Sequence, residues 1–113
     1  MNTNKKVLSL FSGCGGMDIG IEGGFKCIRR MVNEYEHSEW IEEIQGNLVT
    51  LKETGFKTIF ANDIRPDAKS AWVSYFSKRI NNANDIYKLG SIVDLVKRHK
   101  GGEQIFPSEV DVV

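Results

Sequence analysis

The sequence predicts an α/β fold in which a parallel sheet is flanked by helices. Two short apolar runs end in small or polar residues: residues 7–11 ("VLSLF") run into glycines, and residues 57–64 ("KTIFANDI") end near Asn62 and Asp63. Between such runs lie segments in which apolar residues recur at helical spacing. Strands that alternate with helices form parallel sheets. A chain of 113 residues is one modest domain, long enough to bury a core.

Residues 7–11 have the form of a buried parallel strand, because the run is short, apolar and bounded by glycines. Residues 57–64 repeat this form. Residues 109–113 ("EVDVV") resemble a third strand of the same kind, and residues 85–92 ("DIYKLGSI") a weaker one.

Two helices are predicted after the second strand. Pro66 suits a first helical turn, and six apolar residues then fall on one face: Ala68, Ala71, Trp72, Tyr75, Phe76 and Ile80. The next helix is predicted within residues 91–100. It opens with the capping-box spacing of Ser91 and Asp94 and ends in basic residues before Gly101.

An insertion is predicted after the first strand and its loop. The distance from Gly16 to Asp63 is 47 residues, whereas a first crossover of this type normally reaches its acidic residue after about 20 residues. Residues 26–47 therefore read as an inserted, solvated helical segment. Within residues 38–54, four apolar residues recur at helical spacing, so a helix ending at Gly55 is predicted despite Gly46: Ile41, Ile44, Leu48 and Leu51.

Composition excludes several classes of function. Fifteen basic side chains balance fifteen acidic ones, so no net positive field points to nucleic acid or to an anionic membrane. Cys14 and Cys27 form no disulfide framework, and with the isolated His37 and His99 they give no metal-ligand spacing. The apolar run near the amino terminus is too short for an export signal, and no run is long enough to span a bilayer. A cytoplasmic location is expected.

The glycine-rich turn at residues 13–16 and Asp63 predict a ligand site. In such a sheet the first strand ends at the crevice where ligands bind, and glycines let the backbone approach the ligand. Asp63, at the end of the second strand, can accept hydrogen bonds from both hydroxyls of a ribose; its alternative role is to cap the helix that begins near Pro66. NAD and S-adenosylmethionine both satisfy these features, but the turn is Gly-x-Gly-Gly and fits a dinucleotide less well.

Four segments resemble the amino-terminal part of the DNA (cytosine-5) methyltransferases, and they occur in the order of that family: "LFSGCGGMDIGIE", "FANDIRPDA", "LGSIVDL" and "VDVV". The resemblance covers residues 1–113 apart from the insertion. It implies part of a Rossmann-like methyltransferase fold, S-adenosylmethionine as cofactor and cytosine in DNA as substrate. It also implies that residues 109–113 lie beside residues 7–11, with an open sheet edge that favours self-association.

The resemblance assigns a role to each residue of the loop and of the strand ends. Phe11, Ile64 and Ile92 would contact the adenine, and Asp63 would hold the ribose. The methionine end would meet the backbone of Ser12, Gly13, Cys14, Gly15 and Gly16. Ser91 stands where the family usually has an aspartate that accepts from the adenine amino group, so its side chain either takes that contact or caps the helix.

The resemblance puts the catalytic nucleophile, a cysteine in a Pro-Cys pair, just after the strand that residues 110–113 resemble. Cys14 lies in the cofactor loop and Cys27 at the insertion, so neither fits that role, and no catalytic residue is predicted here. We therefore expect an S-adenosylmethionine-binding part of a methyltransferase that is inactive alone and meets DNA through other regions. The alternatives are a subunit of a split methyltransferase, completed by a partner subunit, and a non-catalytic nucleotide-binding or interaction module.

Overall fold

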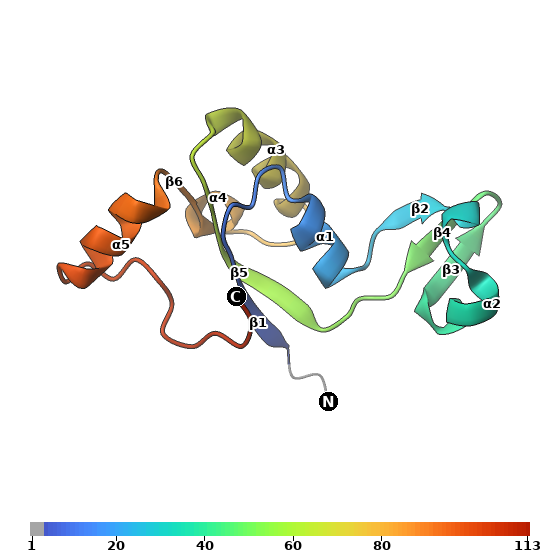
Figure 1. The fold of residues 1–113 in the computed structure, drawn as a ribbon. Coiled ribbons are helices and arrows are strands. Elements are labelled where there is room, and N and C mark those ends of the chain that lie inside the picture. Colours follow the sequence, from blue (N-terminus) through green and yellow to red (C-terminus); the bar gives the residue numbers. More distant parts are fainter. Residues whose placement is uncertain (1–3) are drawn as a thin grey trace.

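The computed structural model describes residues 4–113 and contains two sheets (Figure 1). The first sheet is parallel, with the strand order β1-β5-β6, and comprises β1 (Lys5–Ser9), β5 (Phe56–Asp63) and β6 (Tyr87–Leu89). The second is antiparallel, with the order β2-β4-β3, and comprises β2 (Lys26–Ile28), β3 (Ile41–Gln45) and β4 (Leu48–Leu51). The chain is therefore a mixed α/β protein.

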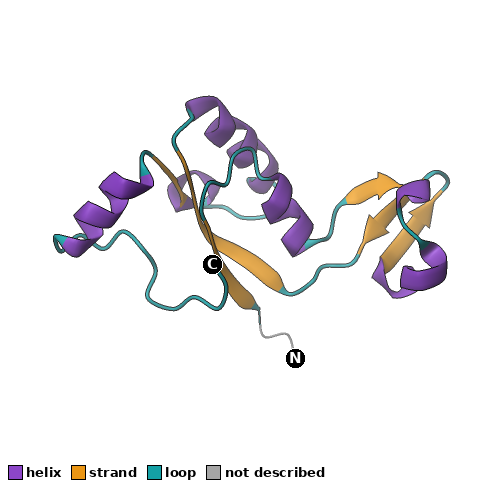
Figure 2. Cartoon of the chain, in the orientation of Figure 1, coloured by secondary structure: helices purple, strands orange, loops and turns teal. Residues whose placement is uncertain are grey.

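Helices cover both faces of the parallel sheet (Figure 2). One face packs against α1 (Gly16–Glu22), α3 (Pro66–Phe76) and α4 (Ala83–Ile86), in a core that includes Trp72 and Tyr87. The other face packs against α5 (Ile92–Lys100) and the extended segment after it, with Phe60 and Leu95 in the core. Because both faces are covered, half of the residues of β5 are buried and the others are half-buried, as predicted for a central parallel strand.

The carboxyl-terminal residues return to the parallel sheet beside β1. Val112 forms a parallel bridge with Val7, and the amide of Leu8 donates to the carbonyl of Val112 at 2.8 Å. The predicted position of residues 109–113 next to the first strand is therefore confirmed. The pairing is limited to this bridge, which leaves Val113 83% exposed.

The prediction of a helical insertion was wrong. Residues 25–54, which we call the inserted unit, hold the antiparallel sheet and three short helical segments: η1 (Arg29–Met31), α2 (Glu34–His37) and η2 (Ser38–Trp40). Residues 38–54 were expected to form one helix. They instead contain η2 and the β-hairpin made by β3 and β4. Gly46 adopts a φ of +61° in the two-residue connection between β3 and β4, which breaks a helix but suits a tight hairpin turn.

The inserted unit forms a separate lobe that joins the parallel-sheet unit through two neighbouring segments of chain (Figure 1). Gly23 bridges Glu53, and the amide of Thr54 donates to the carbonyl of Glu22 at 3.0 Å. A Cβ atom on Gly23 would lie 2.4 Å from the carbonyl oxygen of Lys52, so only glycine lets these segments approach so closely. No helix in residues 4–113 is both long enough and apolar enough to cross a membrane.

Candidate functional site

The predicted site residues gather at the carboxyl edge of the parallel sheet. β1, β5 and β6 run in the same direction, so the segments that follow Ser9, Asp63 and Leu89 leave the sheet at one edge. The loop of residues 10–15 connects β1 to α1, and residues 90 and 91 connect β6 to α5. The sheet thereby brings together three segments that are up to about 80 residues apart in sequence.

Left-handed backbone conformations shape the loop after β1. Phe11, Gly13 and Gly15 have φ angles of 55°, 58° and 98°. Phe11 is the one non-glycine residue with a positive φ in residues 4–113, and its ring is 74% exposed. Such a conformation costs a non-glycine residue about 1–3 kcal/mol and is found more often at functional sites than elsewhere.

Gly15 lets the loop pack directly on the core. A Cβ atom there would lie 2.7 Å from Cδ1 of Trp72, a distance that side-chain carbons do not adopt. The glycine therefore fixes how closely the start of α1 approaches α3, so at least this glycine of the predicted turn has a packing role.

Asp63 holds the loop against the end of β5. Its Oδ2 accepts a hydrogen bond from the amide of Gly13 at 2.8 Å, and its Oδ1 accepts one from the amide of Ile64 at 2.6 Å. An ionised carboxylate offers about four lone-pair positions, so two remain for further donors. The capping role considered for Asp63 is not the one observed, because α3 begins after Arg65 and its first turn contains Asp67.

Tyr87 and Asn62 secure the same loop from beneath. The hydroxyl of Tyr87 donates to the carbonyl of Gly13 at 2.9 Å. The amide of Ser12 donates to the carbonyl of Asn62 at 2.8 Å, and the amide of Asn62 donates back to Oγ of Ser12 at 3.1 Å. Gly13 is thus held through both its amide and its carbonyl, which fixes the plane of the loop.

The hydroxyl of Tyr87 titrates well above its ordinary range. Burial, followed by the nearby charges of Asp63, Asp18 and Cys14, raises the pKa of Tyr87 to about 12. The tyrosine therefore stays protonated at physiological pH and remains a hydrogen-bond donor to the loop.

Asp18, which is only 3% exposed, ties the start of α1 to both β1 and α3. Its Oδ1 accepts from Oγ of Ser9 at 2.6 Å, and its Oδ2 accepts from Nε1 of Trp72 at 2.8 Å. A buried carboxylate with two donors is satisfied within the protein, so Asp18 has a structural role at the site.

Ser91 and Ile92 lie at the third strand end, and both are half-buried. Nδ2 of Asn62 donates to the carbonyl of Gly90 at 3.0 Å, and the amide of Gly90 donates to the carbonyl of Asp63 at 3.0 Å. Oγ of Ser91 accepts from the amide of Val93 at 3.2 Å, so the serine caps α5. Its hydroxyl retains one donor and a second lone pair for other partners.

Large apolar side chains are exposed around this edge of the sheet. Phe11, Met17 and Ile64 are 74%, 78% and 64% exposed, and Leu89 and Val93 are also exposed. They belong to the carboxyl end of β6 and to the segments that follow β1, β5 and β6. Solvent-exposed apolar side chains gathered at one edge, beside a carboxylate with free lone pairs, suit a ligand with a flat apolar part and hydroxyl groups.

The two cysteines are free, and the structure separates them. Cys14 is exposed within the loop, whereas Cys27 is half-buried on β2 of the inserted unit. Neither histidine lies at the loop: His37 stacks on Trp40, and Nδ1 of His99 accepts from the amides of Ile105 and Phe106. In residues 4–113 no three Asp, Glu, His or Cys side chains gather as metal ligands would.

Sequence reasoning identified the loop, Asp63, Ile64, Ser91 and Ile92, and the structure brings these residues together at one edge. It missed Tyr87, Asn62 and Asp18, which hold the loop in position. The signal for Asn62 and Asp18 was present, since each is a polar residue inside an apolar stretch. Tyr87 gave no such signal, because its bond to Gly13 joins residues 74 positions apart.

Comparisons with known proteins do not assign a family or a function to this site. The chain matches no protein-family model, no curated protein and no solved structure.

Proposed function

We propose that the carboxyl edge of the β1-β5-β6 sheet binds S-adenosylmethionine, and that the chain is the cofactor-binding part of a DNA (cytosine-5) methyltransferase. The observation that carries the proposal is the bond between Asp63 and the amide of Gly13. It sets a carboxylate with two free lone-pair positions beside a glycine loop at the ends of adjacent parallel strands.

Each part of the cofactor has a counterpart at this edge. The free lone pairs of Asp63 would accept from the two ribose hydroxyls. The exposed side chains of Phe11 and Ile64 would contact the adenine ring together with Ile92. The backbone of residues 12–16 would meet the methionine end. Oγ of Ser91 already accepts from Val93 to cap α5. A bond from the adenine amino group would therefore use its second lone pair.

The strand order supports a Rossmann-like fold for the parallel-sheet unit. The order β6-β5-β1, followed by the isolated bridge to Val112, puts the first strand between β5 and a later segment of the chain. Ligands of doubly wound folds bind where the strand order reverses, and that point is the end of β1.

The proposed chemistry needs a cysteine thiolate that adds to C6 of the flipped cytosine, so that C5 attacks the methyl group. Cys14 would lie against the cofactor and Cys27 is on the inserted unit, away from the loop. We therefore expect residues 1–113 to bind the cofactor and to transfer no methyl group to DNA by themselves.

Titration calorimetry with S-adenosylmethionine tests the proposal. We expect micromolar binding to the native chain and a loss of at least about tenfold in Asp63→Ala, because hydrogen bonds to a charged group contribute about 1.5–3 kcal/mol. Asp67→Ala is the matched control: Asp67 is also an acidic residue near the end of β5, but it pairs with Arg65. No binding to the folded native chain, or binding of NAD in its place, would overturn the proposal.

A further inference from the structure

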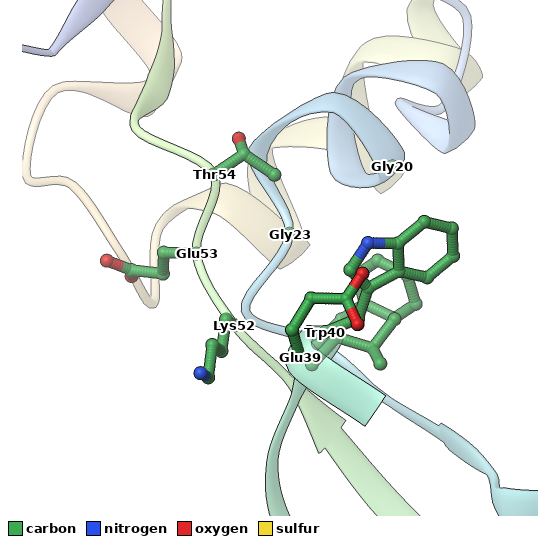
Figure 3. Close-up of a pocket in the computed structure, with 9 residues that line it drawn as sticks. Gly20, Gly23, Glu39, Trp40, Lys52, Glu53 and Thr54 are labelled. Atoms are coloured by element: carbon green, nitrogen blue, oxygen red, sulfur yellow. The ribbon is translucent and has the colours of Figure 1, made fainter. Parts of the chain in front are cut away.

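A hollow lies where the inserted unit meets α1 (Figure 3). Its volume is about 630 Å³, within the range of roughly 300–1,000 Å³ of small-molecule pockets. Apolar side chains of the inserted unit form one side, namely Phe25, Trp40 and Leu51, and the backbone at Gly20 and Gly23 forms the other. The lining is mostly apolar and includes two aromatic rings, so the hollow favours a ligand with substantial carbon surface.

Trp40 lines this hollow, and one face of its indole is already covered. His37 stacks on that face, with ring centroids 3.7 Å apart and an interplanar angle of 4°. Trp40 lines the hollow and His37 does not, so the uncovered face of the indole is the one available to a ligand. An aromatic face fixed in this way attracts a cation placed over it.

The charge at the hollow is negative. Glu39 lines it, and its carboxylate lies 3.7 Å from Nδ1 of His37, the ring that stacks on Trp40. The side chains of Lys52 and Glu53 extend away (Figure 3). The side chain of Glu39 is 64% exposed. The inserted unit carries six glutamates against four lysine and arginine residues, a net charge of −2 over residues 25–54. The field around the hollow therefore favours a cationic ligand over an anionic one.

From these three observations we propose that the junction between α1 and the inserted unit binds a small organic cation. The positive charge of this ligand is surrounded by carbon, as in a quaternary ammonium. The charge lies against the indole face of Trp40 and near the carboxylate of Glu39, and its carbon groups contact Phe25 and Leu51. The hollow is large for one lysine or arginine side chain, so the occupant is a free small molecule.

This site is separate from the glycine loop. The hollow adjoins Gly20 and Gly23 near the carboxyl end of α1, whereas the loop of residues 10–15 precedes the amino end of the same helix. The proposal does not depend on the binding of S-adenosylmethionine. Saturation with S-adenosylhomocysteine should leave the affinity for the organic cation unchanged.

Titration with benzyltrimethylammonium, followed by NMR of the tryptophan indole N–H resonances, tests the proposal. We expect the Trp40 resonance to shift and saturate with a millimolar dissociation constant. The Trp72 resonance should stay fixed, because Trp72 is fully buried and its Nε1 donates to Asp18. Neopentylbenzene, a neutral molecule of nearly the same shape, should bind at least about threefold more weakly, as expected for a cation–π contact at a partly exposed ring.

Two variants test two parts of the site separately, the charge of Glu39 and the space beside Gly20. Glu39→Gln should weaken binding about three- to fivefold, as expected for one exposed charge pair, while Glu36→Gln removes the same charge from the same unit and should leave binding unchanged. Gly20→Leu should abolish binding by filling the hollow. Outside its own helix backbone, no atom lies within 4 Å of a Cβ atom built at Gly20, so a side chain there enters open space. A cooperative thermal unfolding transition of Gly20→Leu checks that the variant is folded before it is titrated.

Three results would overturn the proposal: no saturable shift of the Trp40 resonance in the folded native chain, equal binding of the neutral analogue, or unchanged binding in Gly20→Leu. Competition between benzyltrimethylammonium and S-adenosylhomocysteine would instead show that the cation binds at the loop, and would also overturn it.

Discussion

The parallel-sheet unit and the inserted unit are built by different means. The parallel-sheet unit contains nearly all of the buried apolar side chains, including Trp72, Phe76 and Tyr87. In the inserted unit, all of whose residues are described, Val49 is the only buried apolar side chain. Tyr35 and Met31 of this unit are 93% and 74% exposed.

The difference indicates that the parallel-sheet unit supplies most of the folding stability and that the inserted unit presents mostly exposed side chains. The parallel sheet supplies a rigid frame, and its carboxyl edge holds a loop through hydrogen bonds to Asp63, Tyr87 and Asn62. The inserted unit contributes little core, so most of its side chains are free to interact with other molecules. A change in the parallel-sheet unit should therefore cost much more stability than the same change in the inserted unit.

The two tryptophans give the largest expected contrast. Trp72 is fully buried and donates to Asp18, so Trp72→Ala should lower the free energy of unfolding by about 3–5 kcal/mol. Trp40 is 49% exposed, so Trp40→Ala should cost less than about 1 kcal/mol. Urea denaturation of both variants measures the difference, and equal losses would show that the inserted unit shares the stability of the core.

The pKa of Tyr87 makes stability fall at high pH. Because the folded pKa is raised to about 12 from 10, the folded state binds this proton more tightly than the unfolded state. The resulting stabilisation is complete below about pH 10 and is lost as the pH rises toward 12, by roughly 3 kcal/mol at most. Denaturation of the native chain and of Tyr87→Phe between these pH values isolates the effect, because the variant should lose less stability. The same pH dependence in both would contradict the assignment.

Two glycine substitutions give a smaller contrast. Gly15 and Gly46 both have a positive φ, so alanine strains the backbone at either position by about 1 kcal/mol. At Gly15 the new Cβ atom also meets the ring of Trp72, which should add about 1–3 kcal/mol, whereas at Gly46 it meets no atom within 4 Å. Thermal or urea unfolding compares the two. A greater loss in Gly46→Ala would mean that the hairpin turn is more constrained than the loop.

Much of the parallel-sheet unit could be predicted from sequence because its signals are local. Apolar runs ending in glycines or Asp63, together with Pro66 at a helix start and the Ser91 cap, predicted strands and helices that the structure confirms. The predicted extent of α3 was less accurate. The predicted apolar face reached Ile80, but the helix ends at Phe76.

The inserted unit was wrongly predicted because its spacing suits two structures. Ile41, Ile44, Leu48 and Leu51 fit one helical face, but in the structure Ile41 pairs with Leu51 across a hairpin. The deciding signal was Gly46-Asn47, a two-residue connection that favours a tight hairpin turn between strands rich in β-branched residues. The cost of about 1 kcal/mol for a glycine within a helix counted against the helix but did not by itself indicate the hairpin turn.

The loop and its acidic partner could be predicted at the site, but the bonds that hold them could not. The distance from the glycines to Asp63 was longer than usual, yet the strand ends still bring them together, because the inserted unit projects away from the sheet (Figure 1). The bonds from Tyr87 to Gly13 and from Trp72 to Asp18 depend on packing between distant elements, which spacing along the chain does not reveal.

NMR mapping of backbone amides during titration with S-adenosylhomocysteine tests whether the carboxyl edge of the parallel sheet binds the cofactor. We expect the chemical-shift changes to concentrate at residues 11–16, 63–64 and 90–92, with the inserted unit nearly unchanged. Absence of shifts at these three segments, or shifts concentrated within residues 25–54, would contradict the claim that the carboxyl edge of the parallel sheet binds the cofactor.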